Sequence, residues 1–425
     1  MLPTHFFCLP LRQRIIESIL FMSTLTISII VAFVLGYALI AMESLTKINK
    51  AAVALLMFVF CWVLYMVDPS PFVQLMHPEF KGIGDQLVTF ANKLITEHLG
   101  DTATTLFFLM GAMTIVEIVD QNGGFNWVKD VMRSKSKRSL LWKIAFMTFF
   151  LSAILDNLTT SIVMIMILRK LVQDHKDRMI YASLVIIAAN SGGAFSPIGD
   201  VTTIMLWNAG MITAGGVISE IFIPSLISMI IPAFVLQFLL KGKLGGDMLE
   251  TDHSGDTELL EFNGSQRKII FAIGVGGLCF VPVFHYFTDL PPFVGILFVL
   301  GVLWTITEIF YRNLHRAKGD SEDFSKRVTN LLSRIDMSTI LFFLGILMAV
   351  ACLEEVGILH ELGGGLNSFF QGNHYAVTGI IGVLSSIVDN VPLVAGSMGM
   401  YPIQATGDMA VDGIFWQLLA YCAGV

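Results

Sequence analysis

Long apolar runs recur along the whole chain and constrain its fold more than any other feature. They cover about residues 25–42, 51–67, 104–119, 139–170, 180–213, 217–240, 269–287, 293–311, 338–356, 374–402 and 412–425. A helix of about 20 apolar residues crosses a bilayer, and most of these runs are near that length. Only 14% of the residues are charged, against about 25% in soluble domains. The sequence excludes a soluble globular enzyme and predicts an all-α polytopic membrane protein.

The sequence carries no signal for nucleic acid, a nucleotide or a resident cofactor. It has no basic tract and no Gly-x-x-x-x-Gly-Lys-Ser/Thr phosphate loop. The nine histidines lie in loops or near the ends of apolar runs, without the spacing of a zinc site. The five cysteines are an odd number and fall mostly in apolar runs, so a disulfide framework is not expected. The one partner that composition predicts is the lipid bilayer.

The distribution of basic residues predicts which gaps face the cytoplasm. Lys and Arg gather in five gaps, which hold Lys47/Lys50, Lys129/Arg133/Lys135/Lys137/Arg138, Arg169/Lys170/Lys176/Arg178, Lys241/Lys243/Arg267/Lys268 and Arg312/Arg316/Lys318/Lys326/Arg327/Arg334. By the positive-inside rule all five are cytoplasmic. The gaps at 68–103, 214–217, 288–292 and 357–373 hold only Lys81 and Lys93, so they are predicted to face outside.

The apolar run at 139–170 is predicted to turn back inside the membrane. Both of its flanks are basic, so both are placed in the cytoplasm. Its centre, Leu155-Asp156-Asn157-Leu158-Thr159-Thr160, is polar. We therefore expect a re-entrant hairpin with its tip near Asp156. One long tilted helix is the alternative, and it would place one of the two basic flanks outside.

The run at 180–213 is interrupted by residues that disfavour a continuous helix. Between Ala189 and Asp200 it holds three glycines, one proline and several polar side chains. Unwound backbone at membrane depth is tolerated only where it is buried in protein or lines a cavity. We expect this segment to be unwound between two half-helices of a discontinuous transmembrane helix.

The second half of the chain repeats elements of the first. Phe107-Phe108-Leu109 recurs as Phe342-Phe343-Leu344, and Asp156-Asn157 recurs as Asp389-Asn390. Because 335–425 holds no Lys or Arg, the second hairpin is predicted to start and end outside, which makes an inverted repeat. The predicted organisation is an N-terminal extension (1–21, with Met22 as an alternative start), a first repeat (22–240), a cytoplasmic linker (241–268) and a second repeat (269–425, tip near 389). The second repeat is expected to be incomplete, since a counterpart of Asn190-Ser191-Gly192 would fall at the last three residues.

Three carboxylates, those of Asp156, Asp200 and Asp389, lie deep in apolar runs. Inserting each into a bilayer costs roughly 2.5–3.5 kcal/mol, so their presence indicates function. Beside them stand hydroxyl and amide side chains, and hard cations such as Na⁺ or Li⁺ prefer such oxygen ligands. We expect Asp156 and Asp200 to hold Na⁺ transiently, with a proton competing for the same group.

Structural roles are the alternative for several of these residues. An Asp in this position can serve only as an N-cap of the following helix. The threonine pairs at 159–160 and 202–203 can bond back to helix carbonyls. Glu117, Glu308, Glu354 and Glu355 lie near the ends of runs and are interpreted as interfacial.

These segments resemble a known family of transporters. They are Asp156-Asn157-Leu158-Thr159-Thr160, the stretch from Asn190-Ser191-Gly192-Gly193 to Leu206-Trp207, and Asp389-Asn390-Val391-Pro392-Leu393-Val394-Ala395. All three are similar to the NhaD-type sodium/proton antiporters of the ion transporter superfamily. The similarity covers most of 22–425.

The resemblance implies a multi-pass protein of the inner (plasma) membrane that expels Na⁺ or Li⁺ in exchange for external H⁺. It implies a scaffold part, and a transport part of two opposed hairpins and two broken helices with the ion between them. By position it implies the site residues Asp156, Asn157, Thr160, Asn190, Asp200, Thr202, Thr203 and Asn390, to which the analysis of carboxylates adds Asp389. The sequence leaves a homodimer open as an assembly.

Three rival functions remain. A dicarboxylate or oxyanion carrier of the same superfamily is disfavoured because both hairpin tips begin with Asp, which repels an anion. An intramembrane aspartyl protease is disfavoured because such enzymes resemble a Tyr-Asp plus Gly-x-Gly-Asp pattern. Here Leu155 precedes the first Asp, and Pro197 occupies the place of the first Gly. A truncated chain that folds but transports nothing is the third.

Overall fold

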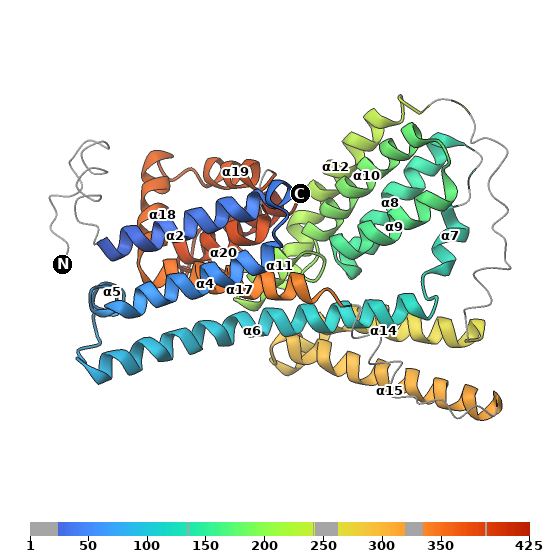
Figure 1. Ribbon diagram of the computed structural model, residues 1–425. Helices are drawn as coiled ribbons and strands as arrows, with labels where there is room; N and C mark the ends of the chain where they lie inside the picture. The colour runs from blue at the N-terminus through green and yellow to red at the C-terminus, as the bar shows by residue number, and fades with distance from the viewer. Residues whose placement is uncertain are drawn as a thin grey trace. The chain divides into compact units, whose positions relative to one another are not determined.

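The computed structural model describes residues 24–132, 134, 136–240, 242, 262–318, 335–386 and 389–425 (Figure 1). The predicted N-terminal extension, 1–21, and most of the predicted linker, 241–268, lie outside these residues. Every regular element in the described ranges is a helix, and these ranges contain no β-strand. The prediction of an all-α protein is confirmed.

The helices follow the apolar runs, and several begin at a capping side chain. Asn49 accepts from the Ala51 amide at the start of α4, and Thr213 accepts from the Gly216 amide at the start of α12. The bounds are α2 Thr24–Ala41, α3 Glu43–Thr46, α4 Lys50–Val67, α5 Ser70–Met76, α6 Asp85–Gln121, α7 Asn126–Met132, α8 Lys137–Leu155, α9 Asn157–Leu171, α10 His175–Ala194, α11 Val201–Asn208, α12 Ala214–Leu236, α14 Gly264–Thr288, α15 Pro292–Lys318, α17 Met337–Glu355, α18 Ile358–Phe369, α19 His374–Ser385, α20 Asn390–Met400 and α21 Ile414–Gly424.

Within the described residues, 8 helices are long and apolar enough to cross a membrane. They are Thr24–Ala41, Lys50–Val67, Asp85–Gln121, Lys137–Leu155, Ala214–Leu236, Gly264–Thr288, Pro292–Leu314 and Met337–Glu355. The chain is therefore a multi-pass membrane protein, as predicted.

Other apolar helices are too short to cross. α9, α19 and α21 have 15, 12 and 11 residues. At 1.5 Å per residue they are about 16–23 Å long, whereas the hydrocarbon layer is about 30 Å thick. Their lengths fit the half-helices and hairpin arms that the sequence predicts.

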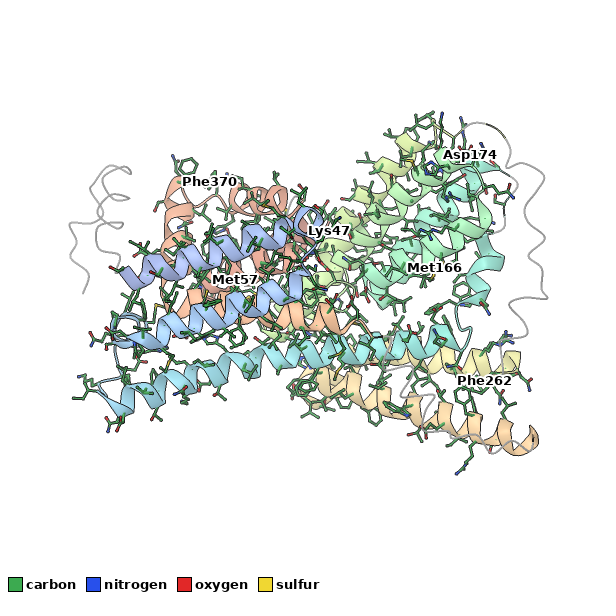
Figure 2. The ribbon with its side chains drawn as sticks, viewed as in Figure 1. Lys47, Met57, Met166, Asp174, Phe262 and Phe370 are labelled. Atoms are coloured by element: carbon green, nitrogen blue, oxygen red, sulfur yellow. The ribbon has the colours of Figure 1, made fainter. Side chains whose placement is uncertain are left out.

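The chain divides into two compact units, and each takes residues from both predicted repeats. Unit 1 comprises 1–102 and 341–363, and unit 2 comprises 103–340 and 364–425. In unit 1, α2 and α4 lie side by side, with Met57 of α4 labelled in Figure 2. A Cβ added to Gly36 of α2 would lie 2.7 Å from the Met57 sulfur, so this approach requires a glycine.

In unit 2, α10 packs against α8, α9 and α12, and α14 packs against α15 (Figure 1). Asp174, labelled in Figure 2, caps α10 by accepting from the Asp177 amide, and this bond lowers the pKa of its carboxyl. The group α8–α12, together with α19–α21, carries all the residues predicted for the site.

Candidate functional site

The polar centre of 139–170 is a sharp turn between two helices. α8 ends at Leu155 and α9 begins at Asn157. Asp156 between them has a φ of 84°, in the left-handed region that non-glycine residues rarely adopt. The alternative of one continuous helix over this segment is wrong.

The start of α8 and the end of α9, which are the two ends far from this turn, lie close together. Lys137 at the start of α8 forms an ion pair with Asp177, 2.5 Å between Nζ and Oδ2. The Tyr181 hydroxyl donates to the Lys137 carbonyl over 2.9 Å. Asp177 and Tyr181 belong to α10, which begins four residues after α9 ends. The outer ends of α8 and α9 therefore lie together, as in a hairpin, while the location of its tip inside a bilayer stays a prediction.

The carboxylate of Asp156 caps α9 with both of its oxygens. Oδ1 accepts from the Thr159 amide at 2.8 Å, and Oδ2 accepts from the Thr159 hydroxyl at 2.7 Å. The alternative interpretation of Asp156 as an N-cap is thus confirmed. Binding of Na⁺ by Asp156 stays a prediction, and it would involve oxygens that already accept hydrogen bonds from Thr159.

The helix break of 180–213 is shorter than the sequence indicates. α10 continues through Ala194, so within the predicted unwound segment 189–200 only 195–200 is non-helical. The expectation of unwound backbone over 189–194 is wrong. Close packing explains the difference, because a Cβ on Gly192 would lie 2.1 Å from the Phe149 carbonyl oxygen of α8. Here the glycine allows two helices to touch rather than ending one of them.

The glycines beside the break bring backbone against backbone. A Cβ on Gly193 would lie 2.6 Å from the Gly199 carbonyl oxygen, and one on Gly199 would lie 2.8 Å from the carbonyl oxygens of Gly193 and Ser152. The Ser152 hydroxyl donates to the Ala189 carbonyl over 2.5 Å, which also fixes α8 to α10. The segment 195–200 is thereby held against the hairpin.

Asp200 is the centre of the polar cluster. It precedes α11 as its N-cap residue, yet its side chain makes no capping hydrogen bond and is 2% exposed. Its Oδ1 accepts from the Asn157 amide at 3.3 Å. Its Oδ2 accepts from the Asn390 amide at 3.2 Å and from the Thr202 hydroxyl at 2.5 Å. A hairpin tip, the broken helix and the second half of the chain thus meet on one carboxylate.

The second half contributes the start of one helix and a residue of another. Asn390 is the first residue of α20, and Asp389 caps this helix by accepting from the Val391 amide at 3.2 Å. At α9 the same order of Asp and Asn recurs, although Asp156 accepts from the amide three residues on and has a positive φ. Gly424 at the end of α21 lies against Asp200, since its added Cβ would lie 3.2 Å from Oδ2.

The remaining predicted residues divide into three groups. Asn190 joins the cluster, because its Oδ1 accepts from the Asn157 amide at 3.3 Å. Thr203 bonds back to the Ser196 and Asp200 carbonyls, as its structural interpretation predicted. Thr160 is completely buried, and its hydroxyl has no hydrogen-bond partner within the described part of the chain.

Helix termini supply the electrostatics of the cluster. Asp200 meets the N-termini of α9, α11 and α20, whose partial positive charge favours an anion. None of its contacts within the described residues is with a Lys or Arg. The carboxylate thus has donors to hold it but no countercharge.

The cluster differs from a resident metal centre. In the described ranges, no three His, Cys, Asp or Glu side chains are grouped so that they could hold a metal ion. What the cluster offers is carboxylate, amide, hydroxyl and backbone oxygen, which suits a hard monovalent cation bound transiently. Sequence reasoning missed the contact of Gly424 with Asp200, for which the repeat gives no glycine signal, since Gly424 corresponds to Ser191 in the first repeat.

Comparisons with known proteins show which proteins the chain is similar to. The sequence model of the citrate transporter family, CitMHS, matches residues 37–424. Sodium/proton antiporter 1 of Arabidopsis thaliana is 41% identical over 392 residues, which are 92% of this chain and 63% of that protein. Sodium/proton antiporter 2 of the same plant is 40% identical over 92% of this chain and 86% of that protein. The Na⁺/H⁺ antiporter NhaD of Alkalimonas amylolytica is 28% identical over 93% and 80% of the two chains.

Proposed function

Since the chain belongs to the citrate transporter family, as a relative of the NhaD-type sodium/proton antiporters, we propose that it exchanges cytoplasmic Na⁺ or Li⁺ for external H⁺. Membership of this family makes it a transporter and not an enzyme. The chain spans 63% of the length of one of these relatives, so the exchange activity is a proposal. We place it in the inner (plasma) membrane; assembly as a homodimer stays a prediction.

One observation carries the proposal: Asp200 is a buried carboxylate with hydrogen-bond donors but no cationic side chain. Burying an unpaired charge is costly, so such a group is most stable when a proton or a metal cation neutralises it. The two ligands exclude each other because both need the same oxygens. Exclusive binding of H⁺ or Na⁺ at one site is what obligatory exchange requires.

The contacts assign roles to the neighbouring residues. Asn157, Asn390 and Thr202 orient Asp200 by donating to it. The Thr202 hydroxyl oxygen already lies beside the carboxylate, and the two amides would have to rotate to offer their oxygens to a cation. Asp156 and Asp389 hold the two amides in position by capping α9 and α20. We propose that Asp156 and Asp200 hold Na⁺ transiently, with Asn190, Thr160, Thr202 and Thr203 completing the polar surroundings.

The name of the family makes an anion carrier the second candidate. Citrate carries several negative charges and needs cationic or N–H partners. The helix N-termini at the cluster could supply N–H groups, but the Asp200 carboxylate at their centre repels an anion. We therefore favour the cation.

The test is exchange in proteoliposomes, read as proton movement driven by a Na⁺ gradient. We expect Asp200→Asn to abolish it and Asp156→Asn to abolish or strongly reduce it, although Asn keeps an oxygen that can accept from the Thr159 amide. Asp289→Asn is the matched control, because Asp289 is exposed after α14 and its φ of 56° suits Asn. Near-normal exchange in both site variants, or citrate uptake by the unaltered protein without Na⁺/H⁺ exchange, would contradict the proposal.

A further inference from the structure

A second buried carboxylate, in unit 1, is held by two histidines. Glu355 at the end of α17 is 6% exposed, so its side chain is buried in protein, while its predicted place near the membrane interface stays a prediction. Its Oε2 lies 2.9 Å from Nε2 of His77, and its Oε1 lies 2.8 Å from Nε2 of His98. His77 is the C-cap of α5 and His98 lies in α6, so three helices are joined through one carboxylate.

The hydrogen bonds fix where a further proton can bind. An ionised carboxylate only accepts hydrogen bonds, so each imidazole carries its hydrogen on Nε2. The free nitrogen of each ring is then Nδ1, and a proton that binds there converts the ring to imidazolium. One such proton changes the net charge of Glu355 and the two rings from −1 to 0. A free imidazole gains or loses this proton between about pH 5 and 8.

The other titratable groups around this cluster are acidic or neutral. Glu79, after α5, has Oε1 3.7 Å from Nδ1 of His77. Asp101 of α6 and Glu354 of α17 act electrostatically on His98. Tyr65 of α4 and Cys352 of α17 lie close enough to act electrostatically with Glu355. Among these groups, only the two imidazoles can supply the positive charge that neutralises Glu355.

Aromatic side chains enclose the cluster. The Trp62 ring centroid lies 6.2 Å from that of His98, and the Phe90 ring meets His77 edge-on at 5.4 Å. The Tyr65 hydroxyl is buried and has no hydrogen-bond partner in the described ranges. The His77 and His98 side chains are only 25% and 20% exposed, so water screens their charge less than at a fully exposed histidine, and gain or loss of one proton has a larger effect.

We propose that Glu355, His98 and His77 form a proton-binding site in unit 1 whose protonation tightens the attachment of α5 and α6 to the end of α17. The bonds to the ionised carboxylate are already charge-assisted, and protonation of a ring adds the attraction between an imidazolium and a carboxylate to its bond. The positive-inside prediction places 68–103 and 357–373 outside, so the site takes its protons from the external solution. It consists of other residues than the Asp200 cluster and does not depend on the proposed exchange.

Trp62 gives a readout that requires no transport, because an imidazolium beside an indole quenches its fluorescence. The experiment titrates tryptophan emission of the purified full chain from pH 5 to 9 and subtracts that of Trp62→Phe. We expect the Trp62 emission to fall as the pH falls. His98→Gln should abolish the fall. Glu355→Gln should move its midpoint to lower pH by about one unit, the size expected for loss of a charge-assisted partner.

A matched control and a second measurement keep the test decisive. Glu97→Gln also removes a carboxylate near His98, but Glu97 is exposed and pairs with Lys93, so the midpoint should not move. Should Glu355→Gln fail to fold, hydrogen–deuterium exchange of the unaltered chain replaces it, and 70–84 and 350–357 should gain protection below the same midpoint. Trp62 emission that stays flat from pH 5 to 9, an unmoved midpoint in folded Glu355→Gln, or protection independent of pH would overturn the proposal.

Discussion

Asn157 and Asn390 each open a helix, and each donates a side-chain amide hydrogen to a different oxygen of Asp200. Each also follows an Asp that caps the same helix. The first residues of two helices from distant parts of the sequence therefore hold one carboxylate, one at each of its oxygens. This arrangement makes Asp200 the shared element of the site and makes the two asparagines equivalent in role.

The equivalence predicts similar effects of two substitutions. Asn157→Ala and Asn390→Ala each remove a hydrogen bond to a buried carboxylate, which is worth about 1.5–3 kcal/mol. We expect each to weaken the apparent Na⁺ affinity roughly ten- to a hundredfold, measured as half-maximal exchange in proteoliposomes. Asn367→Ala on the exposed side of α18 is the control. A large effect of one variant and none of the other would show that the two asparagines are not equivalent.

The close contact of α8 and α10 predicts a loss of stability. Gly192→Ala places a methyl group 2.1 Å from the Phe149 carbonyl oxygen, which requires a backbone shift. We expect a destabilisation of about 1–3 kcal/mol, seen as a lower midpoint of thermal unfolding in detergent. Gly276→Ala in α14 has open space and should leave the midpoint unchanged or raise it. Equal behaviour of the two variants would argue against the contact.

The hairpin predicts that its two outer ends lie on one side of the membrane. Arg138 near the start of α8 and Arg169 near the end of α9 are both exposed. Single cysteines at these positions, in a chain without its five native cysteines, should react with an impermeant thiol reagent only from the cytoplasmic side. Reaction of either one from outside would contradict a re-entrant hairpin.

Local sequence signals predicted the positions of the chain breaks but not their extent. Polar residues in an apolar run marked Asp156, and Gly, Pro and polar residues marked the break before Asp200. The signal failed at 189–194, because the same glycines that weaken a helix also allow the contact with Phe149 that holds it. Packing overrode local preference there.

Contacts between distant residues could not be predicted from one sequence. The repeat of Asp-Asn indicated that 156–157 and 389–390 are related, but not that both asparagines meet Asp200. Glu355 looked interfacial because it ends an apolar run, while its partners His77 and His98 are 278 and 257 residues away. Neither partner leaves a pattern near Glu355 in the sequence.

The last prediction concerns the pH dependence of Na⁺ binding. If H⁺ and Na⁺ compete for the same carboxylate, each Na⁺ that binds there must displace a proton whenever the group is protonated. The apparent Na⁺ affinity should then fall as the pH falls, by at most about tenfold per pH unit for one proton displaced per ion. Above the pH at which the group is fully ionised, the affinity should level off. The measurement is half-maximal exchange in proteoliposomes from about pH 6 to 9. Asn390→Ala should change the affinity but keep its pH dependence, because it removes a donor and not the titrating group. An affinity that is flat across this window would defeat direct competition and require a separate proton site, and an affinity that rises at lower pH would contradict the sign of the mechanism.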